Sequence, residues 1–276
     1  MAAGNDPPYG AGINYYLKTA PAGNVTITIL DQKGQVVRTL PGTNAVGINR
    51  IHWNLRYERS KDIRLRTSPQ YAPDMRVGPE GWRPAPDGGR LSILAPPGNY
   101  TVKLTAGGRP FTQPLTVIKD PYSEGTEAEI QAQVTTLFEL KRDMDRAADI
   151  VNGIEVARSQ IEGLTSVVQD QDVRKAADDL DQKLLAVEQN LVDLRLTGPP
   201  GHTWESRLAR KLSYLASQLA SADFKPTDQQ LEVQKLLEER LASCQSQFDA
   251  LRARDLLALN ELLRQRNRPP ITTGPQ

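Results

Sequence analysis

Residues 115–130 read LTVIKDPYSEGTEAEI, and the organisation of the chain changes within this stretch. Upstream of it, apolar and polar residues alternate with the period of two that is typical of half-buried strands. Downstream, apolar residues recur every three or four positions, as on one face of an amphipathic helix. The pattern predicts two modules joined near residues 120–121, with β structure in the first and α structure in the second.

The first module is predicted to be an immunoglobulin-like β-sandwich over residues 12–120, preceded by a linker-like stretch at residues 1–11. VTITIL at 25–30 and VVRTL at 36–40 are predicted to form a hairpin, because the intervening DQKG offers an Asp to begin the turn and a Gly that tolerates positive φ. Together with this hairpin, about seven short strands are expected. The other predicted strands are INYYLK (13–18), residues 51–55, LSIL (91–94), residues 100–104 and LTVIK (115–119).

A long insertion at residues 56–90 interrupts the predicted sandwich. It holds eight basic residues, five acidic residues and five prolines, and it is too long for a routine loop. Arginines interleaved with aromatic residues can bind carboxylates, sugars or a protein surface, which makes the insertion a candidate contact site. The alternative is a solvated excursion draped over the sandwich. The candidate contact residues are Arg56, Tyr57, Arg64, Arg66, Tyr71 and Trp82.

The second module, residues 123–267, is predicted to be an antiparallel up-and-down helical bundle, because short connections place successive helices side by side. Thr126 and Glu129 have the spacing of a capping box, and the second helix has apolar residues spaced four, three, four, three. A homodimer through these heptads is the less favoured alternative, since four apolar stripes in one chain can satisfy each other. Four helices are predicted, at about 126–165, 170–197, 203–222 and 227–266, followed by a disordered tail at 268–276.

Composition and local patterns exclude several classes of partner and structural feature. Residues 1–120 carry 15 Lys and Arg against 8 Asp and Glu, and residues 121–276 carry 19 against 25, so the halves are about +7 and −6. No strongly basic surface of a nucleic-acid binder is present. The only cysteine, Cys244, excludes an intrachain disulfide and is expected in a helical core. The chain shows neither a signal peptide nor an apolar run long enough for a membrane span.

No catalytic constellation is recognisable. The two histidines, His52 and His202, are isolated, and the chain lacks the zinc-protease His-Glu-x-x-His motif, the phosphate-binding P-loop and the Gly-x-Ser-x-Gly elbow. We therefore expect no catalytic residue, no cofactor and no metal site. Acids such as Asp178, Asp179 and Asp181 are expected on solvated helix faces.

Five stretches of the first module carry a family resemblance. They resemble the C-terminal immunoglobulin-like region that follows the propeller in bacterial sortilin-type, BNR-repeat proteins, which are often labelled glycosyl hydrolases. A helical segment similarly follows the Asp-Pro junction in that family. The same strand order is similar to the immunoglobulin-like domain of the flagellar hook-capping protein. The stretches are PPYGAGINYYLK (7–18), VTITILDQKGQVVRTL (25–40), GINRIHWNLRY (47–57), PPGNYTVKL (96–104) and LTVIKDP (115–121).

The resemblance implies a β-propeller partner, either earlier in the same parent chain or in trans, and an extracytoplasmic location, secreted or periplasmic. It carries over no catalytic residue. The favoured function is a non-catalytic accessory or interaction module that serves domain packing, spacing or assembly in an exported bacterial protein. The alternative is a stand-alone glycan- or peptide-binding protein that uses the insertion, with Trp82 as a contact. A glycoside hydrolase, as the family label suggests, is the least favoured function.

Overall fold

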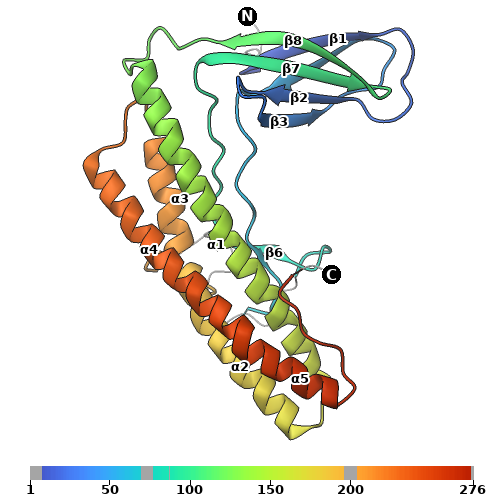
Figure 1. Ribbon diagram of the computed structural model, residues 1–276, viewed down its shortest axis with the longest axis vertical. Coiled ribbons are helices and arrows are strands. Elements are labelled where there is room, and N and C mark those ends of the chain that lie inside the picture. Colours follow the sequence, from blue (N-terminus) through green and yellow to red (C-terminus); the bar gives the residue numbers. More distant parts are fainter. Residues whose placement is uncertain (1–7, 70–76, 87, 196–203, 275–276) are drawn as a thin grey trace, which may run out of the picture. The chain divides into compact units, whose positions relative to one another are not determined.

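The computed structural model describes residues 8–69, 77–86, 88–195 and 204–274. The chain forms two compact units. The first, here called the β unit, comprises Met1–Arg59, Ser92–Thr136 and Ala222–Lys225. The second, the helical unit, comprises Ser60–Leu91, Leu137–Ser221 and Pro226–Gln276. Figure 1 shows an N-terminal β-rich region followed by a C-terminal helical region, which confirms the predicted order.

The β unit contains two antiparallel sheets. One pairs β1 with β4, and the other has the strand order β3-β2-β7-β8. The predicted hairpin of β2 and β3 is confirmed: the Asp31 carboxylate accepts the backbone N–H groups of Lys33 and Gln35, and Gly34 has a φ of 74°. The strands are β1 (Ala11–Leu17), β2 (Thr26–Leu30), β3 (Val36–Pro41), β4 (Gly47–Trp53), β7 (Gly98–Ala106) and β8 (Arg109–Val117).

Side chains from both sheets share one core. Trp53 is fully buried and packs edge-on against Tyr100 with ring centroids 5.5 Å apart. Alternate residues of β2, Ile27 and Ile29, are also fully buried, as a period of two requires.

The strand predicted at residues 91–94 is not formed. Only the isolated bridge between Arg56 and Leu94 involves this segment. Its backbone carbonyls instead accept separate hydrogen bonds, from the N–H of Tyr57 to Ile93, from the guanidinium of Arg56 to Ser92 and from the N–H of Ser60 to Leu91. These bonds pair the backbone carbonyls of the segment without a regular strand ladder. The prediction was wrong because a short apolar run does not by itself identify a strand.

Four helices follow, the last of them interrupted by a π-helical turn. The first is a continuous 41-residue helix, so neither Gly153 nor Gly163 ends it. Capping boxes begin the first and the last helix, at Thr126 with Glu129 and at Thr227 with Gln230. The bounds are α1 (Glu127–Val167), α2 (Gln171–Leu191), α3 (Leu208–Leu219), α4 (Asp228–Leu251), the π turn η1 (Arg252–Leu256) and α5 (Leu257–Gln265).

Two helices are shorter than predicted. The apolar seam of α2 is buried as expected, but the helix ends at Leu191 because the Asp193 carboxylate accepts the backbone N–H and the guanidinium of Arg195 and fixes a turn there. α3 begins at Leu208, and the residue before it is extended. Its predicted cap, Thr203, lies outside the described residues.

The tail predicted to be disordered from residue 268 is held in place as far as Gly274. The side-chain amide of Asn260 exchanges two hydrogen bonds with the backbone of Ile271, and the amide of Gln160 does the same with Thr272. Ile271 is 4% exposed. The prediction was wrong because two amide side chains and one apolar residue suffice to fix a segment whose composition is polar.

Most of the insertion does not belong with the β unit. Residues 60–91 form part of the helical unit, where β5 (Arg64–Leu65) and β6 (Arg83–Pro84) make a small antiparallel pair. β6 lies beside α1 (Figure 1). Among the described residues, every helix is too short or too polar to cross a membrane.

Candidate functional site

The insertion docks on one face of α1 through a ladder of polar side chains. Asp145, Asp149 and Asn152 share this face, because residues three or four apart on a helix are neighbours. The backbone N–H of Lys61 donates to Asp145 at 2.7 Å, and the Lys61 ammonium pairs with Asp149 at 2.7 Å. The backbone N–H of Arg64 donates to the amide oxygen of Asn152 at 2.7 Å. The helix therefore supplies acceptors for main-chain donors of the insertion.

Glu155 is the next member of the ladder and the most buried, with no exposed surface. One of its carboxylate oxygens accepts the backbone N–H of Thr67 at 2.8 Å and that of Arg66. The other oxygen accepts the Thr67 hydroxyl at 2.8 Å. A buried carboxylate is stable only when it is paired and hydrogen-bonded, and the insertion provides these bonds. Glu155 thus holds the insertion on α1, and the hydrogen bonds from the insertion stabilise the buried carboxylate of Glu155.

Arg158, one helical turn later, links three acidic side chains. It bonds to Asp181 at 3.0 Å and to Glu188 at 2.8 Å, both on α2, and lies 3.6 Å from Glu155. Glu188 has no exposed surface, and its Oε1 atom lacks a hydrogen-bond partner in the described part of the chain. Burial above all, and then the charge of Glu155, raise the pKa of Glu188 well above its ordinary value, against the opposing effect of Arg158.

A second arginine, Arg83, comes to this cluster from β6 of the insertion. Its side chain is buried, and its Nε and Nη1 atoms make no hydrogen bond with any described residue. Burial lowers the pKa of Arg83, while the charges of Glu155 and Glu188 oppose that shift. We define the buried charge cluster as Arg83, Glu155, Arg158, Asp181 and Glu188. The carboxylates of Glu155 and Glu188 at its centre are closed to solvent. The cluster brings together one side chain of the insertion, two of α1 and two of α2.

The predicted contact residues that the structure describes are divided between the two units. Arg64 and Trp82 meet in the helical unit, where the guanidinium carbon lies 4.9 Å from the centre of the indole ring. Arg66 lies beside them and donates to the carbonyl of Arg64 at 3.1 Å. Burial, followed by the charge of Arg64, lowers the pKa of Arg66, and Glu155 opposes the shift.

The other predicted residues lie elsewhere. Arg56 belongs to the β unit and donates to the carbonyl of Ser92 at 2.6 Å. Tyr57 packs against the core of the same unit, and burial is the main cause of its raised pKa. Tyr71 lies outside the described residues. Arg56 and Tyr57 therefore make contacts within the β unit, and their role in binding a partner stays a prediction.

Sequence reasoning missed the buried charge cluster. Asp181 was expected on a solvated face, but it is only 23% exposed and pairs with Arg158. The positions of these residues in the sequence could have indicated the cluster. Glu188 directly follows Val187 of the buried α2 seam. Glu155 and Arg158 are one turn apart on a buried stretch of α1. Charged residues so close to an apolar seam indicate a buried network, although they do not identify the partner segment.

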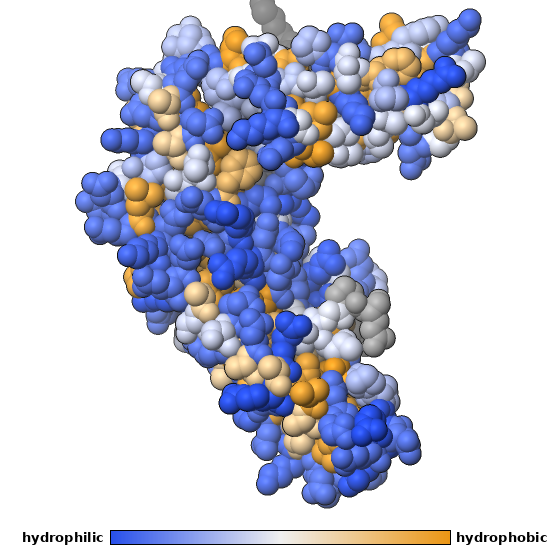
Figure 2. Space-filling view, viewed as in Figure 1, coloured by the Kyte–Doolittle hydropathy of each residue, from blue (hydrophilic) through white to orange (hydrophobic). Residues whose placement is uncertain are grey.

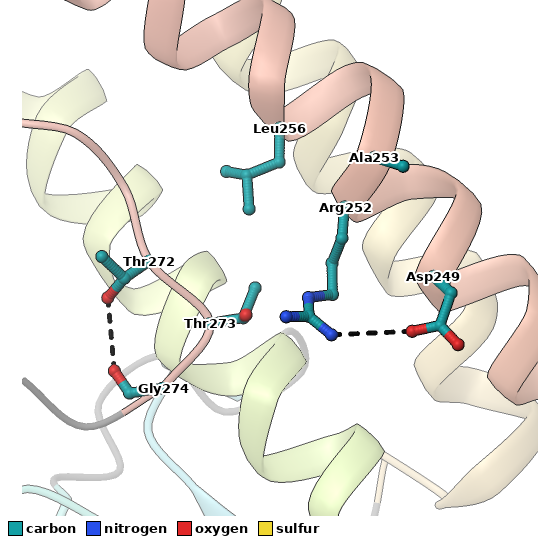
Figure 3. Close-up of a pocket in the computed structure, with 7 residues that line it drawn as sticks. All are labelled: Asp249, Arg252, Ala253, Leu256, Thr272, Thr273 and Gly274. Carbon is teal, nitrogen blue, oxygen red and sulfur yellow. Dashed lines mark hydrogen bonds and ion pairs between the residues drawn. The ribbon is translucent and has the colours of Figure 1, made fainter.

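A hollow of about 620 Å³ lies beside the π turn (Figure 3). Arg252 and Leu256 extend from the helix toward the segment of Thr272, Thr273 and Gly274. π turns often mark functional sites. Here, however, Arg252 is half exposed and already pairs with Asp249 at 3.6 Å, so the hollow offers no uncompensated charge to a ligand.

Within the described residues, no group of three or more His, Cys, Asp or Glu side chains is placed to hold a metal ion. Comparison of the chain with protein-family models, with curated proteins and with solved structures found no match.

Proposed function

We propose that this chain is a non-catalytic accessory module of an exported bacterial protein, serving domain packing, spacing or assembly. In this proposal the β unit is an immunoglobulin-like sandwich and the helical unit is an antiparallel up-and-down bundle. Two antiparallel sheets that share one core support the first assignment. Successive helices with buried apolar stripes support the second.

The observation that carries the proposal is that the fully buried carboxylates, Glu155 and Glu188, contact other parts of the chain and not a cleft. Active sites expose their perturbed carboxylates to a cleft in which substrate can bind. Glu155 and Glu188 have no exposed surface, and Glu155 receives its hydrogen bonds from the insertion. Carboxylates placed in this way join segments of the chain, and they favour a structural role over glycoside hydrolysis.

The partner and location follow from the family resemblance of the β strands. The proposed partner is a β-propeller, carried by the same parent chain or by a second protein, in an extracytoplasmic compartment. Direct glycan binding through Trp82 is less well supported, because the guanidinium of Arg64 already lies over that ring.

The proposal is tested in the source cells with an antibody raised against the 276-residue chain. After fractionation, the antigen is identified by mass spectrometry and native size. We expect an extracytoplasmic species that contains propeller repeats, either in the same polypeptide or in a stable complex. A species confined to the cytoplasm and lacking propeller repeats would contradict the proposal, as would hydrolysis of chromogenic glycosides by the purified chain.

A further inference from the structure

Helix α4 carries a buried apolar stripe and, beside it, apolar residues that stay partly exposed. Leu237, Leu241 and Cys244 belong to the buried stripe. Val233 lies one turn before Leu237, at the border of this stripe, and Leu236 lies farther round the helix; they remain 45% and 47% exposed. Surface helices usually carry one apolar stripe toward the core and polar residues elsewhere. Val233 and Leu236 therefore extend the apolar surface of α4 beyond the part that the described residues of the helical unit cover.

Val233 and Leu236 form part of one wall of a groove between α3 and α4. Tyr214 of α3, which is 65% exposed, lines the groove with Val233 and Leu236. The groove has a volume of about 790 Å³. On the face shown in Figure 2, hydrophilic residues predominate and hydrophobic ones form small separate groups. An apolar groove of this size between two helices is a site at which a third helix can pack.

The groove continues along α4 into a second hollow of about 360 Å³, which shares Ser206, Lys211 and Arg240 with it. Along α4 the lining residues run from Gln229 to Gln247. At a rise of 1.5 Å per residue, this stretch is roughly 27 Å long. It matches a partner helix of about five turns.

The charges along the groove favour a partner with acidic side chains. The charged residues that line it are basic, Arg210, Lys211 and Arg240. The second hollow adds one acid, Glu205, which lies 3.4 Å from the Lys211 ammonium. A second copy of the chain docked by the same face would place basic residues near basic residues. An acidic partner meets no such repulsion.

We propose that the groove between α3 and α4 binds an amphipathic helix of another protein, with apolar residues between Tyr214 and Leu236 and acidic residues toward Arg210 and Arg240. The inference rests on the proposed accessory function, for which it provides a docking surface. It specifies helix-in-groove recognition, in which apolar anchors repeat every three or four residues and flanking charges set the orientation.

The test uses three designed, fluorescently labelled 18-residue peptides and the full chain. The first has leucines at heptad spacing flanked by glutamates, the second scrambles the same residues, and the third replaces each glutamate with lysine. We expect saturable binding of the first peptide, measured by anisotropy, that weakens with added salt and exceeds binding of the other two by at least about tenfold.

Leu236→Glu is the diagnostic variant, since it places a charge in the groove at an exposed position and leaves the buried stripe intact. We expect it to weaken binding of the acidic peptide by at least about tenfold. Leu257→Glu is the matched control, because Leu257 is 64% exposed and does not line the groove, and it should leave binding unchanged. Circular dichroism establishes that both variants are folded.

Equal binding of the scrambled peptide, or undiminished binding to Leu236→Glu, would overturn the proposal. Sedimentation of the chain alone provides a further test: a dimer that Leu236→Glu dissociates would make a second copy the occupant and would also overturn it. These outcomes leave the fractionation test of the accessory function untouched, so the two proposals can fail separately.

Discussion

Glu155 is the residue on which the position of the insertion depends most. Replacing it with alanine removes the acceptors of two backbone N–H groups and the Thr67 hydroxyl, and leaves Arg158 with one acid fewer. We expect Glu155→Ala to lower the free energy of unfolding by about 3–5 kcal/mol, measured by urea denaturation of the helical unit.

Asp149→Ala is the control for this variant. Asp149 also contacts the insertion, but its side chain is 58% exposed, so the loss should be below about 1 kcal/mol. Equal losses for the two variants would show that burial does not distinguish the members of the ladder.

Glu188 makes stability depend on pH in a specific direction. Its pKa is raised in the folded chain, mainly by burial, so the folded state binds this proton more tightly than the unfolded state. The stabilising contribution is complete below the ordinary carboxyl pKa and is lost as the pH rises toward the folded value. Glu188→Gln keeps the neutral form at every pH. We expect the melting temperature of the variant, relative to the parent chain, to increase from pH 5 to pH 8.

The pH series includes Asp178→Asn, an exposed acid on the same helix, as a control that should show no such trend. A constant difference between Glu188→Gln and the parent chain over this range would mean that Glu188 stays ionised.

At the scale of elements, the C-terminal segment is held by few contacts. Ile271 is its buried anchor, and the amides of Gln160 and Asn260 fix its backbone. We expect Ile271→Ala to cost about 2 kcal/mol and to release the segment, since the hydrogen bonds to both amides depend on its position. Hydrogen exchange at Thr272 measures the release, and unchanged protection there would contradict this account.

Local patterns predicted most elements but not the partner of the insertion. The capping boxes at Thr126 and Thr227 and the seam of α2 are encoded within a few residues, so they are readable from the sequence. Glu155 lies 88 positions from Thr67, and no periodicity links the two. Arg64 and Trp82 were predicted as contact residues and do meet, but a composition argument cannot distinguish a mutual contact from a ligand site.

At the scale of the whole molecule, the structure predicts that a truncation of the helices exposes the insertion to protease. Deleting residues 123–276 removes α1 and α2, and so the Glu155, Arg158 and Glu188 side chains on which the insertion packs. We expect the remaining β unit to stay folded around Trp53 while trypsin cleaves after Lys61, Arg64 or Arg66. In the full chain these sites should resist cleavage, because main-chain hydrogen bonds hold the segment on α1. Equal cleavage of both proteins would contradict this view.

The central claim is that the insertion and the helices form one cooperative scaffold. Native-state hydrogen exchange on the full chain, followed by mass spectrometry, tests it most directly. We predict that the amides of Arg66 and Thr67 exchange with the same opening free energy as the interior of α1, and that Glu155→Ala abolishes their protection while the strands of the β unit keep theirs. Rapid exchange of these two amides in the unmodified chain would contradict the account.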